Sequence, residues 1–590
     1  MSVFFQKRIR YTQYFMRIIG VIGLLWVWAG AAFALDIQEV RWGFDGQVVP
    51  ERFNLLSVLV ANPSAEAYEG ALNLTCGHGS GRLGGVEEQP CYLAPFTARW
   101  VQFHPYVVNE NYQWELSWRG DRKTLNFPRL GPPASVLLTE ADLLASRPGG
   151  LKPFNDELFP TTLAALDGLN AVALDYVPRW PAAKRAALRD WVQAGGTALV
   201  LQNAKGEFPV FTDELACLNT PGPRALVGRG TVFRKPTTRR EVHDNAFGPL
   251  PEMTNSQHVA IWSFEQSLFR VLGRHARPRH NWALIYVSAI FYLGVAGPGT
   301  LLLGRWVRDY RIVLGVLLGS VVAFGVLFAV IGQRGQGERS LVYTVSYARS
   351  LGGRQFDVTQ WINLFVTRGG TYTLRHDAPH NLYGVHSDFE SVNSVARNGK
   401  DGALVVDMPV FSQRAVVHQG VLTGDAVAID VIAWKGGDRL EEFAVRPNPE
   451  LQGKITEMWA VSRGYVYPLR WRNEAWSLDW TPQLVSDYFA QDKMAQFNSL
   501  GYQQLDPGTD SQFSSAEMSS IARPLMAYAL GGAYTFTHTI ARPEPVLAEE
   551  VQVFFIAPSP PGFGVVGKDF GRETGFTLYH VTLQNPREHP

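Results

Sequence analysis

The sequence predicts a multidomain α+β membrane protein. Its parts are an N-terminal β-sandwich, a parallel α/β domain, a two-helix transmembrane hairpin and a C-terminal β-rich domain. Three observations predict this order. Two apolar runs of roughly 20 residues lie between Trp282 and Ile331, each long enough to cross a bilayer. Short strand-like segments separated by turn residues precede and follow these runs. Between residues 135 and 203, two apolar strands flank a helical pattern, as in parallel sheets.

The first 34 residues predict an export signal. Lys7, Arg8, Arg10 and Arg17 precede an apolar run that ends in Ala32-Phe33-Ala34. A basic segment, an apolar segment and an A-x-A site are typical of a signal peptide. The long apolar segment leaves an uncleaved N-terminal anchor as the alternative. In either case, the residues after Ala34 are expected to be exported.

Residues 35–130 predict a β-sandwich of immunoglobulin type. The segments FNLLSVLVAN, ALNLTC, TARWVQFHPYV and YQWELSWR are rich in β-branched and aromatic residues, and their regular spacing is typical of sandwiches. Such a domain is a docking module or a spacer. Cys76 and Cys91 lie close together in the sequence, and an exported domain permits a disulfide between them. Cys217 is left as a buried or half-buried thiol.

Residues 131–255 predict an α/β domain. SVLLT (135–139), AVALDYV (171–177) and TALVLQN (197–203) read as strands, and PAAKRAALRDWVQAGG as a helix with Pro181 in its first turn. A fourth strand is expected at 228–234. Ligands of parallel sheets bind beyond the carboxyl ends of the strands. The candidate ligand-binding residues there are Glu140, Asp175, Tyr176 and Asn203, although strand ends are polar in many domains that bind nothing.

Several catalytic motifs are absent from the sequence. No GxGxxG or GxxxxGK[ST] loop opens a helix, so a nucleotide cofactor is not expected. No G-x-S-x-G or G-x-C-x-G elbow follows a strand, so acyl or glutamine hydrolysis would lack its nucleophile. We therefore expect no cofactor.

Residues 280–332 predict the membrane hairpin. Arg305 and Arg308 lie in the turn between the two spans, on the side that the positive-inside rule assigns to the cytoplasm. Arg270 and Arg274, before the first span, oppose this orientation. Gly297 and Pro298 lie within the first span, where the proline predicts a kink. Gly315 and Gly319 form a small-xxx-small face, which packs either on the other span or on a partner helix.

Residues 338–590 predict an exported β-rich domain with a few helices. Strands are expected in LVYTVSYARS, FDVTQWINLFV, EEVQVFFIAP and GFTLYHVTLQNP, with the last strands of a second sandwich in 451–471. Helices are expected in 482–501 and 514–532, the latter with Ser515 as N-cap. His376, His380 and His386 are weak metal candidates, because the segment lacks an HExxH pattern and solvated turns use the same residue types. The aromatic residues Trp459, Tyr465, Tyr467, Trp471, Trp476 and Trp480 belong to the core or form a sugar platform.

The segment DGLNAVALDYVPRWPAAKRAALRDWVQAGGTALVLQN resembles the glutamine-amidotransferase-like (flavodoxin-like) domain of uncharacterised exported bacterial membrane proteins. In those proteins an immunoglobulin-like domain commonly precedes it, and a YLxxxGP hairpin with an arginine-containing turn follows; Tyr292, Leu293, Gly297 and Pro298 match that pattern. Class I amidotransferases use a cysteine nucleophile, but Cys217 is not in an elbow. The resemblance therefore implies a fold and an envelope location, without a reaction.

These observations favour a membrane-anchored envelope protein that acts as a non-catalytic scaffold or binding protein. The expected location is the inner membrane, with both large regions periplasmic or extracellular. Expected partners are membrane lipid and an envelope protein, with a glycan as the other candidate. A net charge of +1 lacks the basic footprint of a nucleic-acid binder. The alternative is an envelope hydrolase that uses the strand-end crevice or a His/Asp metal cluster.

Overall fold

The computed structural model describes residues 35–585 except 79–80, 109–111, 141–150, 240, 242–263, 277–281, 308, 334–339, 387–391, 438, 480, 490–496, 498, 501–512, 531–549, 567–569 and 571. The predicted signal peptide (1–34), Arg308 and Trp480 lie outside the described residues. The chain is strand-rich, with 47% strand and 25% helix. It divides into two compact units, Met1–Leu250 with Val395–Asn398, and Pro251–Ser394 with Gly399–Pro590. The protein is therefore multidomain, as predicted.

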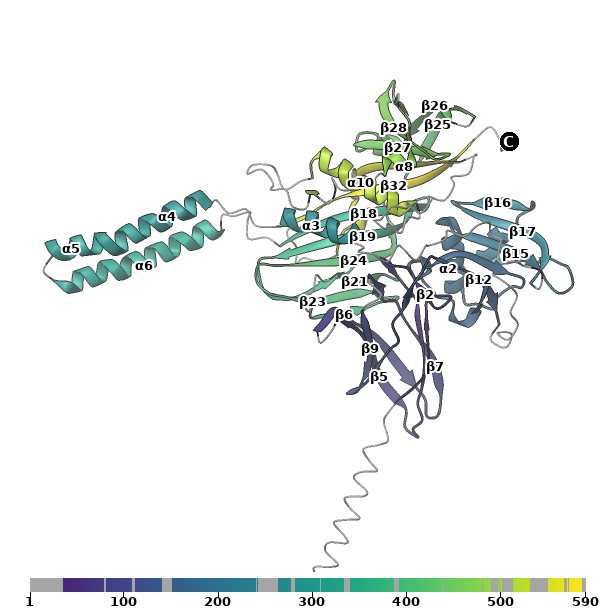
Figure 1. Ribbon diagram of the computed structural model, residues 1–590, viewed down its shortest axis with the longest axis horizontal. Helices are drawn as coiled ribbons and strands as arrows, with labels where there is room; N and C mark the ends of the chain where they lie inside the picture. Colours follow the sequence, from purple (N-terminus) through teal and green to yellow (C-terminus); the bar gives the residue numbers. More distant parts are fainter. Residues whose placement is uncertain are drawn as a thin grey trace, which may run out of the picture. The chain divides into compact units, whose positions relative to one another are not determined.

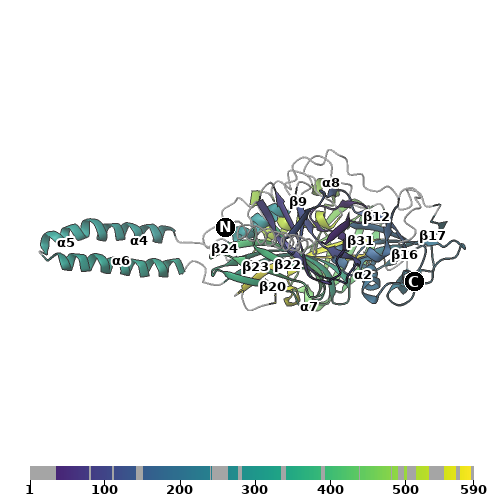
Figure 2. The same cartoon turned by 90° about the horizontal axis from the view of Figure 1, so that it is seen from below.

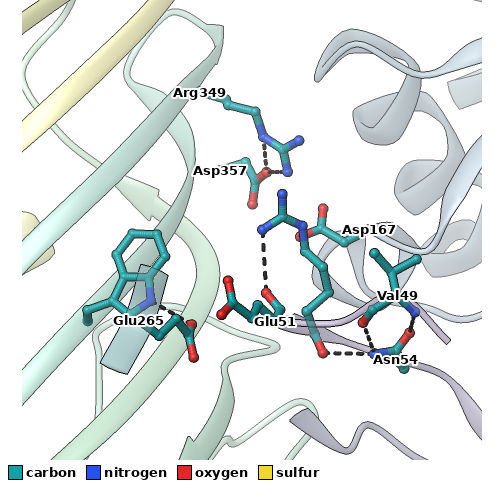
Figure 3. A network of polar contacts seen from close by, with 9 residues as sticks. Val49, Glu51, Asn54, Asp167, Glu265, Arg349 and Asp357 are labelled. Carbon is teal, nitrogen blue, oxygen red and sulfur yellow. Dashed lines mark hydrogen bonds and ion pairs between the residues drawn. The ribbon is translucent and has the colours of Figure 1, made fainter. Parts of the chain in front are cut away.

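The first unit begins with two antiparallel sheets around one core. One sheet has the order β1 (Asp36–Trp42), β4 (Leu56–Ala61), β7 (Ala98–Phe103), and the other contains β10 (Asp121–Thr124), β9 (Gln113–Trp118), β5 (Tyr68–His78) and β6 (Gly81–Leu93). Trp114, Leu116 and Trp118 alternate inward along β9 and join Leu56 and Val58 of β4 in the core. Two short ladders pair β2 (Gln47–Val48) with β11 (Arg129–Leu130) and β3 (Arg52–Phe53) with β8 (Tyr106–Val107). Beside them, Asn54 closes a turn through hydrogen bonds with the backbone of Val49 (Figure 3).

A distant segment completes this first unit. Within β22 (Ser394–Arg397), Val395 and Ala396 pair in parallel with Val86 and Glu87 of β6. The Gln89 side-chain amide donates a hydrogen bond to the Asn398 carbonyl at 2.9 Å, and Arg397 forms an ion pair with Glu88 at 2.8 Å. Burial raises the pKa of Glu87 to about 7, although the backbone N–H of His104 donates to its carboxylate. Four consecutive residues of β6 thus hold a segment that follows them by about 300 residues.

The disulfide considered between Cys76 and Cys91 is not formed. Both thiols are free, and Cys91 lies opposite Gly70 in the β5–β6 ladder. Cys76 is six residues further along β5, which corresponds to about 20 Å at the rise of an extended strand. A disulfide requires Cα atoms within about 7 Å, so the pairing register of the two strands excludes the bridge. Burial raises the pKa of the Cys76 thiol to about 12.

The α/β part of the first unit contains a six-stranded sheet in the order β13 (Lys152–Asn155), β12 (Ala134–Thr139), β14 (Leu169–Leu174), β15 (Thr197–Gln202), β17 (Gly230–Thr238), β16 (Arg224–Val227). All neighbouring pairs are parallel except β16 with β17. Helix α2 (Ala182–Gln193) follows β14 and ends before Gly195, which has a φ of +125° that suits glycine. Single turns of helix occur at Asp156–Leu158, Leu163–Leu166 and Asp213–Leu218. The four predicted strands and the helix are present.

The second unit contains one twelve-stranded sheet, where the sequence predicted the strands of a second sandwich. Its strands are, in sheet order, β21 (Leu382–His386), β24 (Ser412–Thr423), β19 (Gln355–Val366), β18 (Leu341–Gly352), β32 (Arg572–Gln584), β31 (Glu550–Pro558), β27 (Glu457–Ser462), β28 (Tyr465–Arg472), β29 (Ala475–Leu478), β26 (Leu440–Pro447) and β25 (Ile429–Gly436), with β30 (Gln483–Leu484) beside β28. The parallel pairing of β18 with β32 joins its early and late strands. The strands of 451–471 therefore extend this sheet. Outside this sheet, β20 (Gly370–Leu374) pairs antiparallel with β23 (Ala403–Met408).

An ion pair joins two helices of the second unit, α3 (Phe264–Ala276) and α10 (Ser515–Ala529). Helix α3, which the sequence analysis missed, contacts β18, β19 and β24, and its buried Glu265 accepts a hydrogen bond from Trp361 at 2.7 Å (Figure 3). Helix α10 begins with a capping box in which Ser514, and not Ser515, is the N-cap and Glu517 its partner. Arg274 of α3 forms an ion pair with Glu517. The other helical segments are α7 (Pro449–Gln452), α8 (Val485–Tyr488), which lies in the predicted helix 482–501, and the turn Pro561–Phe563.

The apolar runs form two long helical segments that lie side by side (Figures 1 and 2). The first consists of α4 (Trp282–Gly294), a π-helical turn (Val295–Gly299) and α5 (Thr300–Trp306), and the second is α6 (Tyr310–Gln333). Pro298, predicted to kink the first span, lies in the π-helical turn. The Thr300 hydroxyl donates to the carbonyls of Ala296 and Gly297 at 2.6 and 3.0 Å. These bonds satisfy backbone acceptors near the proline, which lacks an N–H.

Candidate functional site

The two apolar segments are long enough to cross a membrane and expose their side chains. Ala283–Trp306 and Tyr310–Val330 have mean hydropathies of 1.6 and 2.7, and neither is buried. Leu301 and Ile290, for example, are 73% and 69% exposed. A soluble core helix would bury such side chains, whereas exposed apolar patches of this size mark surfaces that other apolar groups cover. This arrangement indicates membrane association.

The glycines of α6 face away from the first apolar segment. The ring of Phe324 lies 5.9 Å from that of Phe291 and 5.1 Å from that of Tyr292, so this side of α6 contacts α4. A Cβ atom added at Gly315 or Gly319 would meet nothing within 4 Å. The prediction that these glycines pack the hairpin against itself is therefore wrong. Aromatic rings make the contact, because Gly315 is about half a turn from Phe324 at 100° per residue.

The predicted site at the ends of the parallel strands contains a half-buried ion pair. Asp175, which follows β14, binds Arg239, which follows β17, with 2.9 Å between Nε and Oδ2. Arg239 also donates to the carbonyl of Leu138 at 2.9 Å. The two charged side chains are only 15% and 17% exposed. The strand-end rule could have found Arg239, since it comes directly after a strand that is parallel to the others.

Tyr176 is bound within the same cluster. Its hydroxyl donates to the carboxylate of Asp156 at 2.7 Å, and the Trp180 indole donates to the Asp156 carbonyl at 3.0 Å. Burial and the neighbouring Asp156 raise the pKa of Tyr176, so it stays protonated as a hydrogen-bond donor. Burial also lowers the pKa of Lys184, whose ammonium group donates to the Glu157 carbonyl. Asp156 follows β13, a short strand that the sequence analysis did not recognise.

The other two predicted ligand-binding residues lie differently. The Asn203 side chain accepts hydrogen bonds from the backbone N–H groups of Lys205 and Glu207 at 2.8 and 3.1 Å, so it stabilises its own turn. Glu140 is exposed at the end of β12, next to residues outside the described part of the chain. The strand ends thus bring Asp175 and Tyr176 together with Arg239 and Asp156, whereas Asn203 has a local structural role.

Asp156, Asp175, Tyr176 and Arg239 form a cluster at the strand ends, called the strand-end cluster below. Replacing Tyr176 by phenylalanine tests whether this cluster stabilises the fold. We expect Tyr176→Phe to lower the free energy of unfolding by about 1 kcal/mol, because Asp156 loses one hydrogen-bond donor while the ring is kept. Chemical denaturation followed by tryptophan fluorescence would measure the change. Val177→Ala, at an exposed neighbouring position, is the control and should change it by less than about 0.5 kcal/mol. A cluster built for a ligand would instead tolerate Tyr176→Phe without loss of stability.

A second polar cluster lies in the second unit and is buried. His376 and His418 stack with ring centroids 3.7 Å apart, and His376 Nδ1 lies 2.8 Å from the hydroxyl of Tyr383. His418 lies between the side-chain oxygens of Gln360 and Asn381, at 2.8 and 3.0 Å. Burial lowers the pKa of His376 to about 3, and burial together with His376 lowers that of His418 well below its usual value. The imidazoles are therefore neutral at pH 7.

The three histidine candidates for metal binding are not brought together. His376 belongs to this stack and His380 has a φ of +61° in the following turn, while the side chain of His386 lies outside the described residues. Among the described residues there is no group of three or more His, Cys, Asp or Glu side chains that could hold a metal ion. In the aromatic set, Trp459, Tyr467 and Trp476 are buried, as expected for core residues. Trp471 is 39% exposed.

The fold and these sites define a multidomain, strand-rich protein with two helices long and apolar enough to span a membrane. No protein-family model and no curated protein matches the sequence. Among the solved structures that match is a cycloisomaltooligosaccharide glucanotransferase from Paenibacillus sp. complexed with cycloisomaltoheptaose. The match covers 76% of this chain and 98% of that chain, with 8% identity and a TM-score of 0.15. At that score the likeness carries no argument about fold or function.

Proposed function

We propose that this chain is a membrane-anchored envelope protein that acts as a non-catalytic scaffold or binding protein. The observation that carries the proposal is the pair of exposed apolar segments, Ala283–Trp306 and Tyr310–Val330. Their backbone hydrogen bonds are internal, as a bilayer requires. The proposed location is the inner membrane, with a short cytoplasmic turn at Arg305 and the large regions exported.

The pairing of β6 with β22 supports the placement of the residues before and after the hairpin on the same side of the membrane. Val395 and Ala396 follow the second span in sequence but pair with Val86 and Glu87, which precede the first span. Backbone hydrogen bonds cannot form through a bilayer, so the pairing requires an even number of crossings between these segments. A hairpin of two spans meets that requirement.

The domain identities belong to the same proposal. We assign residues 35–130 to an immunoglobulin-like sandwich, supported by two antiparallel sheets around a shared core. We assign residues 131–255 to a flavodoxin-like domain without its nucleophile, supported by five parallel strands in the order β13-β12-β14-β15-β17. The twelve-stranded sheet of the second unit follows the hairpin in the sequence. The proposed partners are membrane lipid and an envelope protein or glycan.

The strand-end cluster supports a non-catalytic role. Its principal polar groups bind one another, as the Asp175–Arg239 and Tyr176–Asp156 contacts show. An acid, base or nucleophile must reach a substrate atom, whereas these side chains are held by internal partners. The proposed activity is therefore binding, carried out by exported surfaces.

Protease digestion of intact spheroplasts tests the proposed topology. Both large regions are expected to be digested, while a cytoplasmic marker protein stays intact until lysis. Antibodies against residues 35–250 and 400–590 would follow each region separately. Protection of either region before lysis would contradict the proposal. Stoichiometric zinc in the purified chain, or hydrolytic activity that Asp175→Asn abolishes without unfolding, would instead favour the hydrolase.

A further inference from the structure

One pocket in the second unit lies outside the sites described above. Its volume is about 520 Å³, within the usual range for small-molecule sites. It lies where the parallel strands β18 and β32 begin, between the end of β31 and the first turn of α10. Its residues come from four segments that are far apart in the sequence, so the completed fold is needed to form it.

The walls of this pocket are largely apolar, and its polar lining residues include a single charged side chain. Phe513, Met518 and Phe576 supply apolar surface, and Thr344, Thr456 and Ser559 supply hydroxyl groups. Glu573 is the only ionisable side chain among the lining residues. The potential in the pocket is therefore negative, which disfavours anions and favours cations.

The carboxylate of Glu573 is held by neutral donors. It accepts a hydrogen bond from the backbone N–H of Val565 at 3.2 Å and a long one from the Thr344 hydroxyl at 3.5 Å. No ion pair joins it to any described lysine, arginine or histidine. Glu573 as a whole residue is exposed, but burial of its carboxyl group raises the pKa of that group. A cation in the pocket would supply the charge partner that the described residues do not.

We propose that this pocket binds an organic amine, with the ammonium group on Glu573 and an apolar body against Phe513, Met518 and Phe576. The carboxylate provides a charge-assisted hydrogen bond, which is stronger than one between neutral groups. The apolar walls favour a ligand with an alkyl or aromatic portion over a small inorganic cation. The site does not depend on the proposed membrane topology or on the strand-end cluster.

Calorimetric titration of the full chain in nanodiscs tests this site. The probes are 4-phenylbutylamine and its neutral counterpart 4-phenylbutanol, with empty nanodiscs as the blank. We expect saturable binding of the amine that is at least tenfold tighter than binding of the alcohol. Glu573→Gln should weaken amine binding at least tenfold and leave alcohol binding unchanged, while it keeps an acceptor for the Val565 N–H.

Two further variants complete the test. Thr456→Trp, at an exposed position of the pocket wall, should block both probes by filling the space. Glu442→Gln removes an exposed carboxylate on β26, outside the lining residues, and should leave binding unchanged. Absence of saturable amine binding by the wild type would overturn the proposal, as would equal binding of amine and alcohol. An equal effect of Glu573→Gln and Glu442→Gln would also overturn it.

Discussion

Lowering the pH from 7 to 5 is expected to destabilise the second unit by about 2 kcal/mol through His376, and in the same direction through His418. The folded unit keeps His376 neutral down to pH of about 3, and His418 is likewise held neutral. The unfolded chain takes up a proton on each imidazole below pH of about 6.5. Because the unfolded state then binds more protons, stability is fully present above pH 6.5 and falls as the pH decreases. Urea denaturation at pH 7, 6 and 5 would measure this.

The matched variants separate this effect from general acid denaturation. His376→Gln removes one of the two titrating rings and should reduce the loss between pH 7 and 5 by about 2 kcal/mol, whatever its own cost at pH 7. His380→Asn gives a comparison, because asparagine tolerates the positive φ of this half-buried turn position. Burial and Lys400 also lower the pKa of His380, so this variant should reduce the loss in the same direction but by less than His376→Gln. An unchanged pH dependence in His376→Gln would show that the stacked pair titrates normally.

Removing the charge of Glu517 is expected to cost about 3 kcal/mol of unfolding free energy. The side chains of Arg274 and His275 are 9% and 1% exposed and face this carboxylate, and Glu517→Gln would remove the negative charge beside the buried guanidinium. Burial alone would raise the pKa of Glu517, but hydrogen bonds from His275 and Ser514 lower it to about 2. The contribution is therefore present above pH of about 4.5 and is lost toward pH 2.

A double-mutant cycle isolates this interaction. Arg274→Met removes the buried charge, so Glu517→Gln should cost much less in that background than in the wild type. Ser515→Ala, at the exposed neighbouring position, is the control and should change stability by less than about 0.5 kcal/mol. If Glu517→Gln lowered the free energy of unfolding of the wild type by less than about 0.5 kcal/mol, the ion pair between α3 and α10 would not stabilise the fold as proposed. Urea denaturation of the four variants measures all these terms.

The spacing of apolar residues within a segment predicted those helices and strands whose buried face can be identified from that segment alone. Helix α2 was recognised from the apolar positions Ala186, Leu188, Trp191 and Val192 and from the glycines after it. Leu188, Trp191 and Val192 are buried in the structure, whereas Ala187 is buried in place of Ala186. The apolar spans and strands β12, β14 and β15 were recognised in the same way. Helix α3 was missed because arginines at its end were interpreted as flanks of the first span. Its apolar face contacts strands that follow the hairpin.

The contacts within the candidate sites were harder to predict, because they join distant segments. Asp175 and Arg239 are 64 residues apart, and His376 and His418 are 42 residues apart. A register between two strands decides the Cys76–Cys91 separation, and sequence proximity of the cysteines carries no information about it. The side of α6 that the glycines occupy was left open between the other span and a partner helix, because composition identifies a small-residue face without stating which helix covers it.

The position of β32 has a consequence for how the chain is made. This strand lies between β18 and β31 in the middle of the twelve-stranded sheet, yet it is synthesised about 220 residues after β18 (Gly352 to Arg572). Until it emerges, β18 has an unpaired edge that can recruit other extended chains. Such non-local pairing slows folding. The second unit is therefore expected to complete its sheet only after β32 has been synthesised, and chaperone protection during that interval should raise its yield.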